Sequence, residues 1–141
     1  MAARLTDGVR ELIRGKNFGH LSTIMSDGSP QVSTVWVDLE GDYVLVNTNE
    51  GRSKPRNVRR DPRVAIAIAE SGNEYNAVFI RGRVIEIRPD ADKAHIDRMS
   101  QKYTGRERYG GEGDERIVFL IEPESVVTYG RLRREELAAQ Q

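Results

Sequence analysis

The sequence contains no cysteine and only two histidines, His20 and His95, which lie far apart in the chain. The absence of cysteine excludes disulfides, thiolate metal ligands and thiol catalysis together, and it suits a reducing cytosol. A zinc or iron site would then depend mainly on carboxylates, and no cluster of carboxylates at ligand spacing is present. We therefore expect no metal site, and each histidine is more readily interpreted as structural than as catalytic.

The chain also lacks an excess of one charge, long apolar segments and many aromatic residues. Lysine plus arginine and aspartate plus glutamate number 22 each, whereas nucleic-acid-binding domains usually carry a basic excess. Aromatic residues make up 6% of the chain, which leaves few rings for stacking on bases. No apolar run approaches the roughly 20 residues that span a bilayer. The composition predicts a cytoplasmic protein whose partners include neither nucleic acid nor membrane.

The 141 residues are expected to form one domain over 1–141, with an N-terminal helix within 1–17 and a polar tail at 131–141. The helix is predicted at 6–16 because apolar residues recur there at helical spacing, namely Val9, Leu12 and Ile13. Thr6 or Asp7 can cap its first turn.

Alternating apolar and polar residues, separated by turn sequences such as Asp-Gly at 27–28, predict a chain dominated by strands. Further helices are expected at 53–60 and 90–104, the latter with Ala94, Ile96 and Met99 toward the core. No βαβ pattern is present, so these elements predict a mainly β, α+β fold: a six-stranded antiparallel barrel with a few short helices. The strands are expected at 19–26, 30–39, 43–47, 63–70, 75–88 (with a bulge at Gly82) and 116–130, the last as one strand or as two separated near Pro123.

A basic segment at 47–60 follows the third expected strand. A helix N-terminus offers unpaired N–H groups and a partial positive charge, so it can bind a phosphate. Ser53 stands where an N-cap is expected, and Pro55 falls in the first turn. The alternative is a solvated basic face that Glu50 and Asp61 partly neutralise, and the residues alone leave both interpretations open. The segment contains five cations: Arg52, Lys54, Arg56, Arg59 and Arg60.

The strand at 30–39 carries Trp36, the single tryptophan. Alternation places Gln31 and Ser33 on one face with valines, a surface that could contact a flat heterocycle. For Trp36, packing in the core or in a dimer is the better expectation, because large aromatic residues are more often packed than in contact with ligand. No serine–histidine–acid arrangement or carboxylate pair at motif spacing is visible, so an organic cofactor would have to carry any catalysis.

The order of these features resembles the flavin- and deazaflavin-binding split β-barrels, a superfamily that includes pyridoxamine 5′-phosphate oxidase. Three stretches carry the resemblance: "GHLSTIMSDGSPQVSTVWV", "YVLVNTNEGRSKPRNVRRDPRVAIAI" and "VFIRGRVIEI". Within the superfamily the chain is most similar to the actinobacterial oxidoreductases that use coenzyme F-420, with their "K-x-R-N-x-R-x-D-P" motif at 54–62. The resemblance covers about residues 18–129.

This resemblance implies a six-stranded split β-barrel and a homodimer with two cofactor sites at the subunit interface. Lys54 and Arg56 match positions that hold the cofactor phosphate, and Asn57 belongs to the same motif. Thr48 and Ser53 match nearby hydrogen-bonding positions. The strand segment that would run along the tricyclic ring comprises Ser33, Thr34, Val35 and Trp36. Cations that could contact the acidic tail of coenzyme F-420 are Arg59, Arg60 and Arg81.

The resemblance implies an F-420H2-dependent reductase that transfers a hydride between the deazaflavin and a small unsaturated or heteroaromatic substrate. FMN is the alternative cofactor, since both cofactors have a phosphate and a flat ring. A non-catalytic flavin- or deazaflavin-binding protein is a third possibility. Vitamin B6 oxidation is not expected, because no histidine follows His95 in the sequence. Specificity is expected from the glycine-rich loop 105–115, where Tyr109 could cover a ring.

Overall fold

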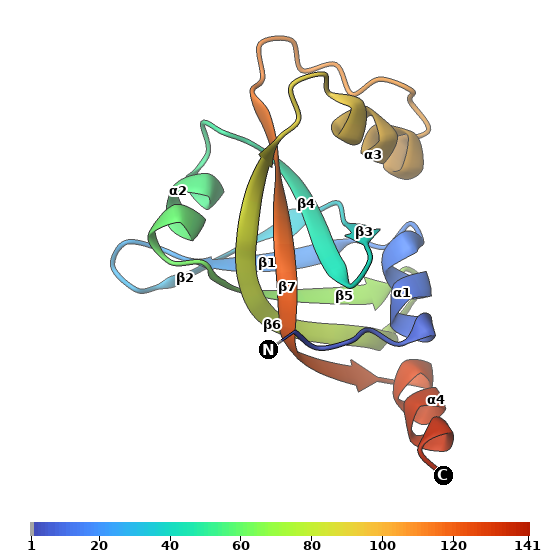
Figure 1. The fold of residues 1–141 in the computed structure, drawn as a ribbon. Helices are drawn as coiled ribbons and strands as arrows, with labels where there is room; N and C mark the ends of the chain where they lie inside the picture. Colours follow the sequence, from blue (N-terminus) through green and yellow to red (C-terminus); the bar gives the residue numbers. More distant parts are fainter. Residues whose placement is uncertain (1) are drawn as a thin grey trace.

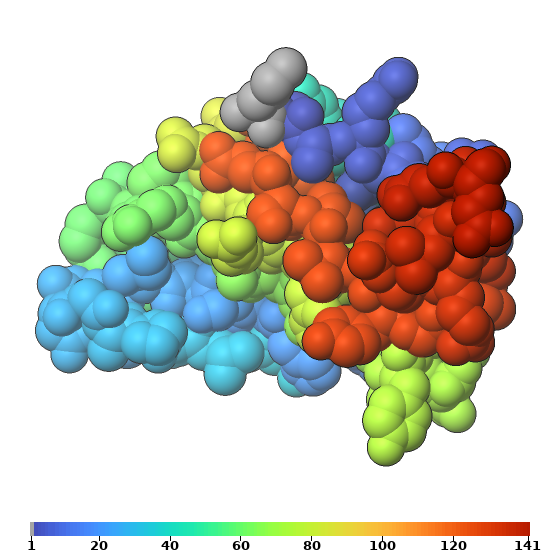
Figure 2. All heavy atoms as spheres, turned by 90° about the horizontal axis from the view of Figure 1, so that it is seen from below, coloured from blue at the N-terminus to red at the C-terminus, as the bar shows by residue number. Residues whose placement is uncertain are grey.

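Seven strands form one antiparallel sheet in the computed structural model, which describes residues 2–141 (Figure 1). The order across the sheet is β2-β1-β5-β6-β7-β4-β3, and four helices surround it. The β1–β2 hairpin and α4 lie at opposite ends of the face shown in Figure 2. The elements are α1 (Asp7–Arg14), β1 (Gly19–Ile24), β2 (Pro30–Val35), β3 (Asp38–Glu40), β4 (Tyr43–Asn49), α2 (Ser53–Arg60), β5 (Arg63–Glu70), β6 (Asn73–Pro89), α3 (Ala94–Thr104), β7 (Arg116–Tyr129) and α4 (Arg131–Ala139).

The mainly antiparallel α+β barrel is confirmed, but six strands is wrong, because the strand expected at 30–39 is divided into β2 and β3. The break falls at the link Trp36–Val37. The Val37 N–H donates to the Tyr103 hydroxyl at 3.0 Å, and Lys102 Nζ donates to the Val37 carbonyl at 2.9 Å. These peptide groups therefore bond to α3 instead of to a neighbouring strand. Because β2 and β3 are the two edges of the sheet, this link, here called the seam, joins the edges.

The barrel core is filled from one face of each strand, as alternation predicts. In β5, Val64, Ile66 and Ile68 are buried in the main cluster, while the alanines of the strand lie on the opposite face. The α1 helix buries its expected stripe in the same cluster, and the Thr6 hydroxyl accepts a hydrogen bond from Val9 N–H. The polar tail forms α4, which is anchored by the buried side chain of Leu132.

The long strand β6 bends where Gly82 was expected to form a bulge. The register against β7 shifts between Arg81 and Gly82. A Cβ atom at Gly82 would lie 2.1 Å from the carbonyl oxygen of Glu122, so only glycine allows this approach of the two strands. The bend therefore depends on glycine at this position.

The α3 helix begins at Ala94, later than expected. Ile96 and Met99 are buried as predicted, but Ala94 is exposed, and His95 is buried beside Ile96 instead. The buried carboxylate of Asp90 accepts hydrogen bonds from the N–H groups of His95 and Ile96, so it caps the first turn from outside the helix. Within residues 2–141, no helix is long and apolar enough to cross a bilayer.

Candidate functional site

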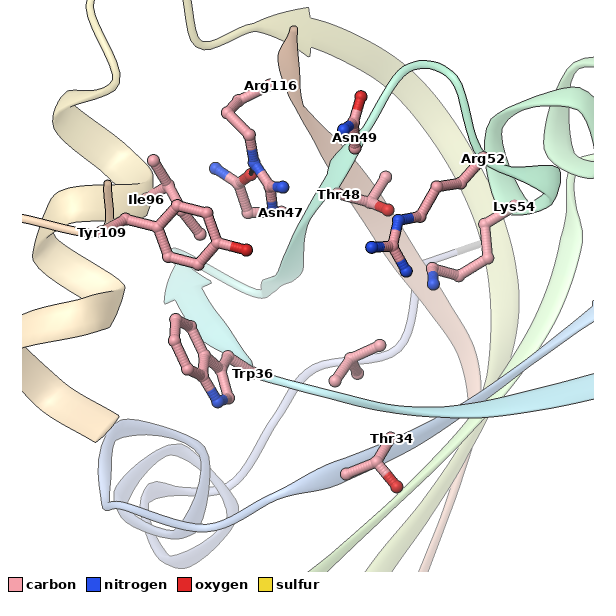
Figure 3. A pocket seen from close by; sticks show the side chains of 11 residues that line it. Thr34, Trp36, Asn47, Thr48, Asn49, Arg52, Lys54, Ile96, Tyr109 and Arg116 are labelled. Atoms are coloured by element: carbon pink, nitrogen blue, oxygen red, sulfur yellow. Dashed lines mark hydrogen bonds between the residues drawn. The ribbon is translucent and has the colours of Figure 1, made fainter. Parts of the chain in front are cut away.

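A pocket of about 180 Å³ opens between α2 and α3 (Figure 3). Strand β4 runs between the two helices (Figure 1). The ends of β2 and β4 and the start of β7 supply its strand residues, and the loop after α3 supplies an aromatic ring. The lining residues are Thr34, Val35, Trp36, Asn47, Thr48, Asn49, Arg52, Lys54, Ile96, Tyr109 and Arg116.

Among the residues that the structure describes, no carboxylate lines this pocket, and three cations do: Arg52, Lys54 and Arg116. Lys54 is half-buried, and its pKa is lowered, first by burial and then by the positive charges of Arg52 and Arg116. Burial without an anion disfavours the charged form of a lysine. An anionic ligand would relieve this cost, so the lining fits a group such as a phosphate.

The first turn of α2 differs from the expected cap. Arg52 is the N-cap, and its side chain makes no capping hydrogen bond; Ser53 is already helical. The Ser53 hydroxyl donates to Gln31 Oε1 at 3.1 Å, and Asn57 Nδ2 donates to the same oxygen at 3.2 Å. Asn57 also donates to the Thr23 hydroxyl at 3.0 Å. Gln31, Ser53 and Asn57 thus fasten α2 to the β1–β2 hairpin, and the expectation that Ser53 is the N-cap is wrong.

The other cations of the basic segment point elsewhere. Arg59 forms a two-point ion pair with Glu50, and Arg56 is exposed outside the pocket lining. Arg81 lies on the outer face of β6, where it lines a separate hollow. Of the predicted site residues, the pocket brings together Thr34, Val35, Trp36, Thr48 and Lys54, and it does not include Ser33, Ser53, Arg56, Asn57, Arg59 or Arg81.

Aromatic side chains form the end of the pocket beside α3. The Trp36 ring stacks on Tyr103, with centroids 5.3 Å apart and planes 4° apart, and it meets Tyr109 edge to face at 6.0 Å. Trp36 is therefore both packed and part of the wall. The loop that carries Tyr109 is tied to α3, because Tyr109 N–H donates to Asp97 Oδ1 and Lys93 Nζ donates to the Gly111 carbonyl. Tyr109, which the sequence offers as a residue that could cover a ring, lines the pocket.

Sequence reasoning missed Asn47 and Arg116, which meet across the β4–β7 pairing. Arg116 Nε donates to Asn47 Oδ1 at 3.0 Å. The Asn47 amide nitrogen lies 2.9 Å from both Asp90 Oδ2 and His95 Nδ1, and His95 Nε2 lies 3.0 Å from Asp38 Oδ2. The buried His95 is therefore engaged at both ring nitrogens, which agrees with a structural role.

No local pattern identifies this network, because Asn47 and Arg116 are 69 residues apart. The only available signal is the run of polar residues that ends a strongly apolar strand at 47–49.

A second hollow, of about 330 Å³, lies on the other side of Arg116 and differs in charge. Its lining includes acidic residues that pair with its cations: Glu50 with Arg59, and Asp114 with Arg116. Because carboxylates outnumber arginines in this lining, the hollow has no comparable demand for an anion.

Comparison with known proteins places the chain among split barrels. A sequence model of the family described as pyridoxamine 5′-phosphate oxidase matches residues 5–130. The solved structure of an F-420 reductase is similar, with a TM-score of 0.79 and 26% identity, covering 87% of this chain and 98% of that chain. A conserved hypothetical protein from Mycobacterium tuberculosis has a TM-score of 0.71 and 21% identity, covering 91% of this chain and 86% of that chain.

A candidate pyridoxamine 5′-phosphate oxidase from Listeria innocua also shares the fold. Its TM-score is 0.67 at 18% identity, and the match covers 86% of this chain and 95% of that chain.

Proposed function

Because the chain belongs to the pyridoxamine 5′-phosphate oxidase family, we propose that it is an oxidoreductase that uses coenzyme F-420. In this proposal it is an F-420H2-dependent reductase of a small unsaturated or heteroaromatic substrate. The deazaflavin would supply the hydride chemistry when bound, and the chain's own residues would bind and orient it. This agrees with the absence of any triad or carboxylate pair at motif spacing in the sequence.

The observation that carries the proposal is the half-buried Lys54 facing two other cations. Lys54 and Arg52 extend side by side from the start of α2 into the pocket (Figure 3). They would hold the cofactor phosphate, with the buried Thr48 hydroxyl beside them as a hydrogen-bonding group. The resemblance also assigns Arg56 to the phosphate. Because Arg56 is exposed and outside this pocket, we favour Arg52 over Arg56 as the second phosphate-binding cation.

The choice of coenzyme F-420 over FMN is supported by the 26% identity with an F-420 reductase, which spans nearly all of that chain. FMN remains the alternative, because it also has a phosphate and a flat ring.

We further propose that the protein is a homodimer with the cofactor at the subunit interface. The pocket holds about 180 Å³, less than the roughly 300–1,000 Å³ of most small-molecule sites. A second copy would supply the missing wall. Thr34 lines the pocket and also belongs to a row of paired residues that crosses the outer face of the sheet: Thr34, His20, Ala67, Phe79 and Val127.

One part of this outer face exposes apolar side chains. Phe79, Val127 and Tyr129 are 43%, 51% and 58% exposed, and the Phe79 and Tyr129 rings meet at 5.4 Å. The alanines of β5 lie on the same face and leave it flat. Exposed apolar patches of this kind mark interaction surfaces, and their continuity with Thr34 supports an interface that borders the pocket.

A direct test titrates the purified protein with coenzyme F-420 and with FMN while the fluorescence of the cofactor ring is followed. The proposal expects saturable binding of F-420, and hydride loss from F-420H2 with at least one conjugated acceptor in a broad panel. An FMN spectrum that survives purification, with no response to F-420, would instead support the FMN alternative. Binding of F-420 without turnover across the panel would support a non-catalytic carrier.

A further inference from the structure

Arg116 is the one pocket cation that stands apart from the phosphate end. In Figure 3, Arg52 and Lys54 lie together on the α2 side, whereas Arg116 lies across the pocket beside Asn47 and Tyr109. Its side chain is 7% exposed, so its charge faces the two hollows that it lines and not open solvent. The pocket therefore has two separate cationic ends, and a single phosphate at the α2 end would leave the second one unmatched.

The guanidinium of Arg116 is held in a fixed orientation. Nε donates to Asn47 Oδ1 at 3.0 Å, and Nη1 reaches Asp114 Oδ2 at 3.3 Å. Asn47 is itself held by Asp90 and His95 through its amide nitrogen. These contacts use two of the five N–H groups of the arginine. Among residues 2–141 they leave Nη2 for a ligand.

Asp114 does not remove the charge that Arg116 presents to the pocket. The Nη1–Oδ2 contact is long at 3.3 Å, and Asp114 is absent from the pocket lining. The positive charge of Arg116 still acts on Lys54, whose pKa it helps to lower. A second anionic group at this end would complete the balance of charge.

The surroundings of Arg116 select a flat ligand. Its Cζ lies 4.8 Å from the centroid of the Tyr109 ring, and Trp36 meets the same ring edge to face. Ile96 and Val35 complete the apolar part of the wall. A conjugated ring could lie among these groups while a carboxylate on its edge reaches Nη2, because guanidinium groups bind carboxylates with matched geometry.

We propose that the Arg116 end of the pocket takes the hydride acceptor and that this acceptor is a planar conjugated carboxylate. Arg116 is then a specificity-determining residue, and Asn47 is a positioning residue that acts through it. The assignment to the acceptor rests on the proposed function, whereas recognition of a planar carboxylate by Arg116 does not.

The single tryptophan gives a readout without turnover, because Trp36 lines the pocket. The cofactor-free protein is titrated with 4-nitrobenzoate and with its neutral isostere 4-nitrobenzamide, and quenching of Trp36 fluorescence is measured. We expect the carboxylate to bind at least about tenfold more tightly than the amide. Equal affinity of the wild-type protein for the two probes would overturn the proposal before any variant is made.

Arg116→Gln should remove the preference for the carboxylate and leave the amide affinity nearly unchanged. Because Arg116 is buried, Arg116→Lys is a second variant that keeps the charge, and it should retain part of the preference. Arg14→Gln, at an exposed arginine of α1, is the matched control and should bind both probes as the wild type does. A preference that survives both changes at Arg116 would contradict the proposal.

Two competition experiments distinguish the Arg116 end of the pocket from the Lys54 end and from the cofactor site. Inorganic phosphate in excess should leave 4-nitrobenzoate bound, since displacement would mean that the probe occupies the Lys54 end. Protein saturated with F-420 should still bind the probe, and mutual exclusion would assign Arg116 to a cofactor group instead of to the acceptor. If F-420 and FMN fail to bind while the Arg116-dependent preference persists, the proposed function fails and the carboxylate site stands.

Discussion

Lys54 carries an electrostatic cost in the ligand-free protein, because it is half-buried and the nearby charges of Arg52 and Arg116 have the same sign. Lys54→Met should therefore leave the free energy of unfolding unchanged or slightly raised. Affinity for coenzyme F-420 should fall by about tenfold or more, since a charge-assisted hydrogen bond to the phosphate is lost. Urea unfolding and cofactor titration measure the two effects separately.

The matched control for Lys54 is Lys16→Met, at an exposed lysine outside the pocket. It should alter neither the free energy of unfolding nor the affinity for coenzyme F-420. Parallel losses of stability and affinity in Lys54→Met would indicate a structural lysine and would argue against the phosphate site.

Lys54 and Arg116 differ in how far the sequence alone could identify them. Lys54 stands at the start of a short helix in a dense basic segment, so local pattern and helix electrostatics made it a candidate, beside the alternative of a solvated basic face. Arg116 sits at the start of a strand, and its partners Asn47 and Tyr109 become neighbours only through the pairing of β4 with β7 and the return of the loop. For Ser53 the local pattern was misleading. It predicts an N-cap, but the Ser53 hydroxyl donates a hydrogen bond to Gln31 on the neighbouring hairpin.

The α3 helix maintains the seam of the barrel through Tyr103. Its hydroxyl donates to the Asn17 carbonyl at 2.7 Å and accepts from Val37 N–H at 3.0 Å. Burial raises the pKa of Tyr103 to about 12, so the hydroxyl keeps its proton over the physiological range. Tyr103→Phe leaves a buried donor and acceptor unpaired, and the free energy of unfolding should fall by about 1–3 kcal/mol.

Chemical denaturation checks this prediction, with Tyr43→Phe as a control at a half-buried tyrosine of β4. The control should change stability by less than about 0.5 kcal/mol. A loss in Tyr103→Phe no larger than in the control would mean that α3 does not hold the seam.

Asp90 ties the N-terminal turn of α3 to stability at low pH. Burial would raise its pKa, but hydrogen bonds from the N–H groups of Ile96 and His95 and from Asn47 outweigh burial and lower it. A carboxyl with a lowered pKa stabilises the fold fully above its unfolded value of about 3.9. That contribution is lost as the pH falls through the lower value in the folded protein.

Asp90→Asn should therefore be less stable than the wild type at pH 7, and the difference should shrink as the pH is lowered from about 5 to 3. Urea midpoints across this range provide the measurement. Glu112→Gln, at an exposed carboxylate, should show no such convergence, and a constant gap for Asp90→Asn would refute the assignment.

Most elements were predictable because their patterns are local. The Asp-Gly turn, the alternation in β5 and the Ser53–Arg60 helix each need only a few neighbouring residues. The division between β2 and β3 was not predictable, since valines continue the alternation through Val37. Strand β2 ends because the peptide groups of Val37 form hydrogen bonds with Lys102 and Tyr103, about 65 residues later in the chain.

At the scale of the whole molecule, the apolar outer face predicts that the chain associates with itself. Phe79→Glu places a charge in the centre of that face, between Ala67 and Val127. The variant should shift from dimer toward monomer in light scattering coupled to size exclusion. It should also bind coenzyme F-420 several-fold more weakly, although Phe79 is not in the pocket lining.

Leu137→Glu provides the comparison, because this residue is also exposed but lies on α4. It should leave both mass and affinity unchanged. A wild-type protein of monomer mass that binds the cofactor fully would contradict the proposed interface.

The order of strands also bears on how the chain comes to fold. β7 is the last strand along the chain, yet it lies between β6 and β4 in the sheet. The β3–β4 hairpin therefore has no sheet to join until residues 116–129 have been synthesised. Pairings of such long sequence separation form slowly. On a ribosome, β4 would thus leave the exit tunnel with only β3 to pair with, and the pocket between α2 and α3 could assemble only after nearly the whole polypeptide is available.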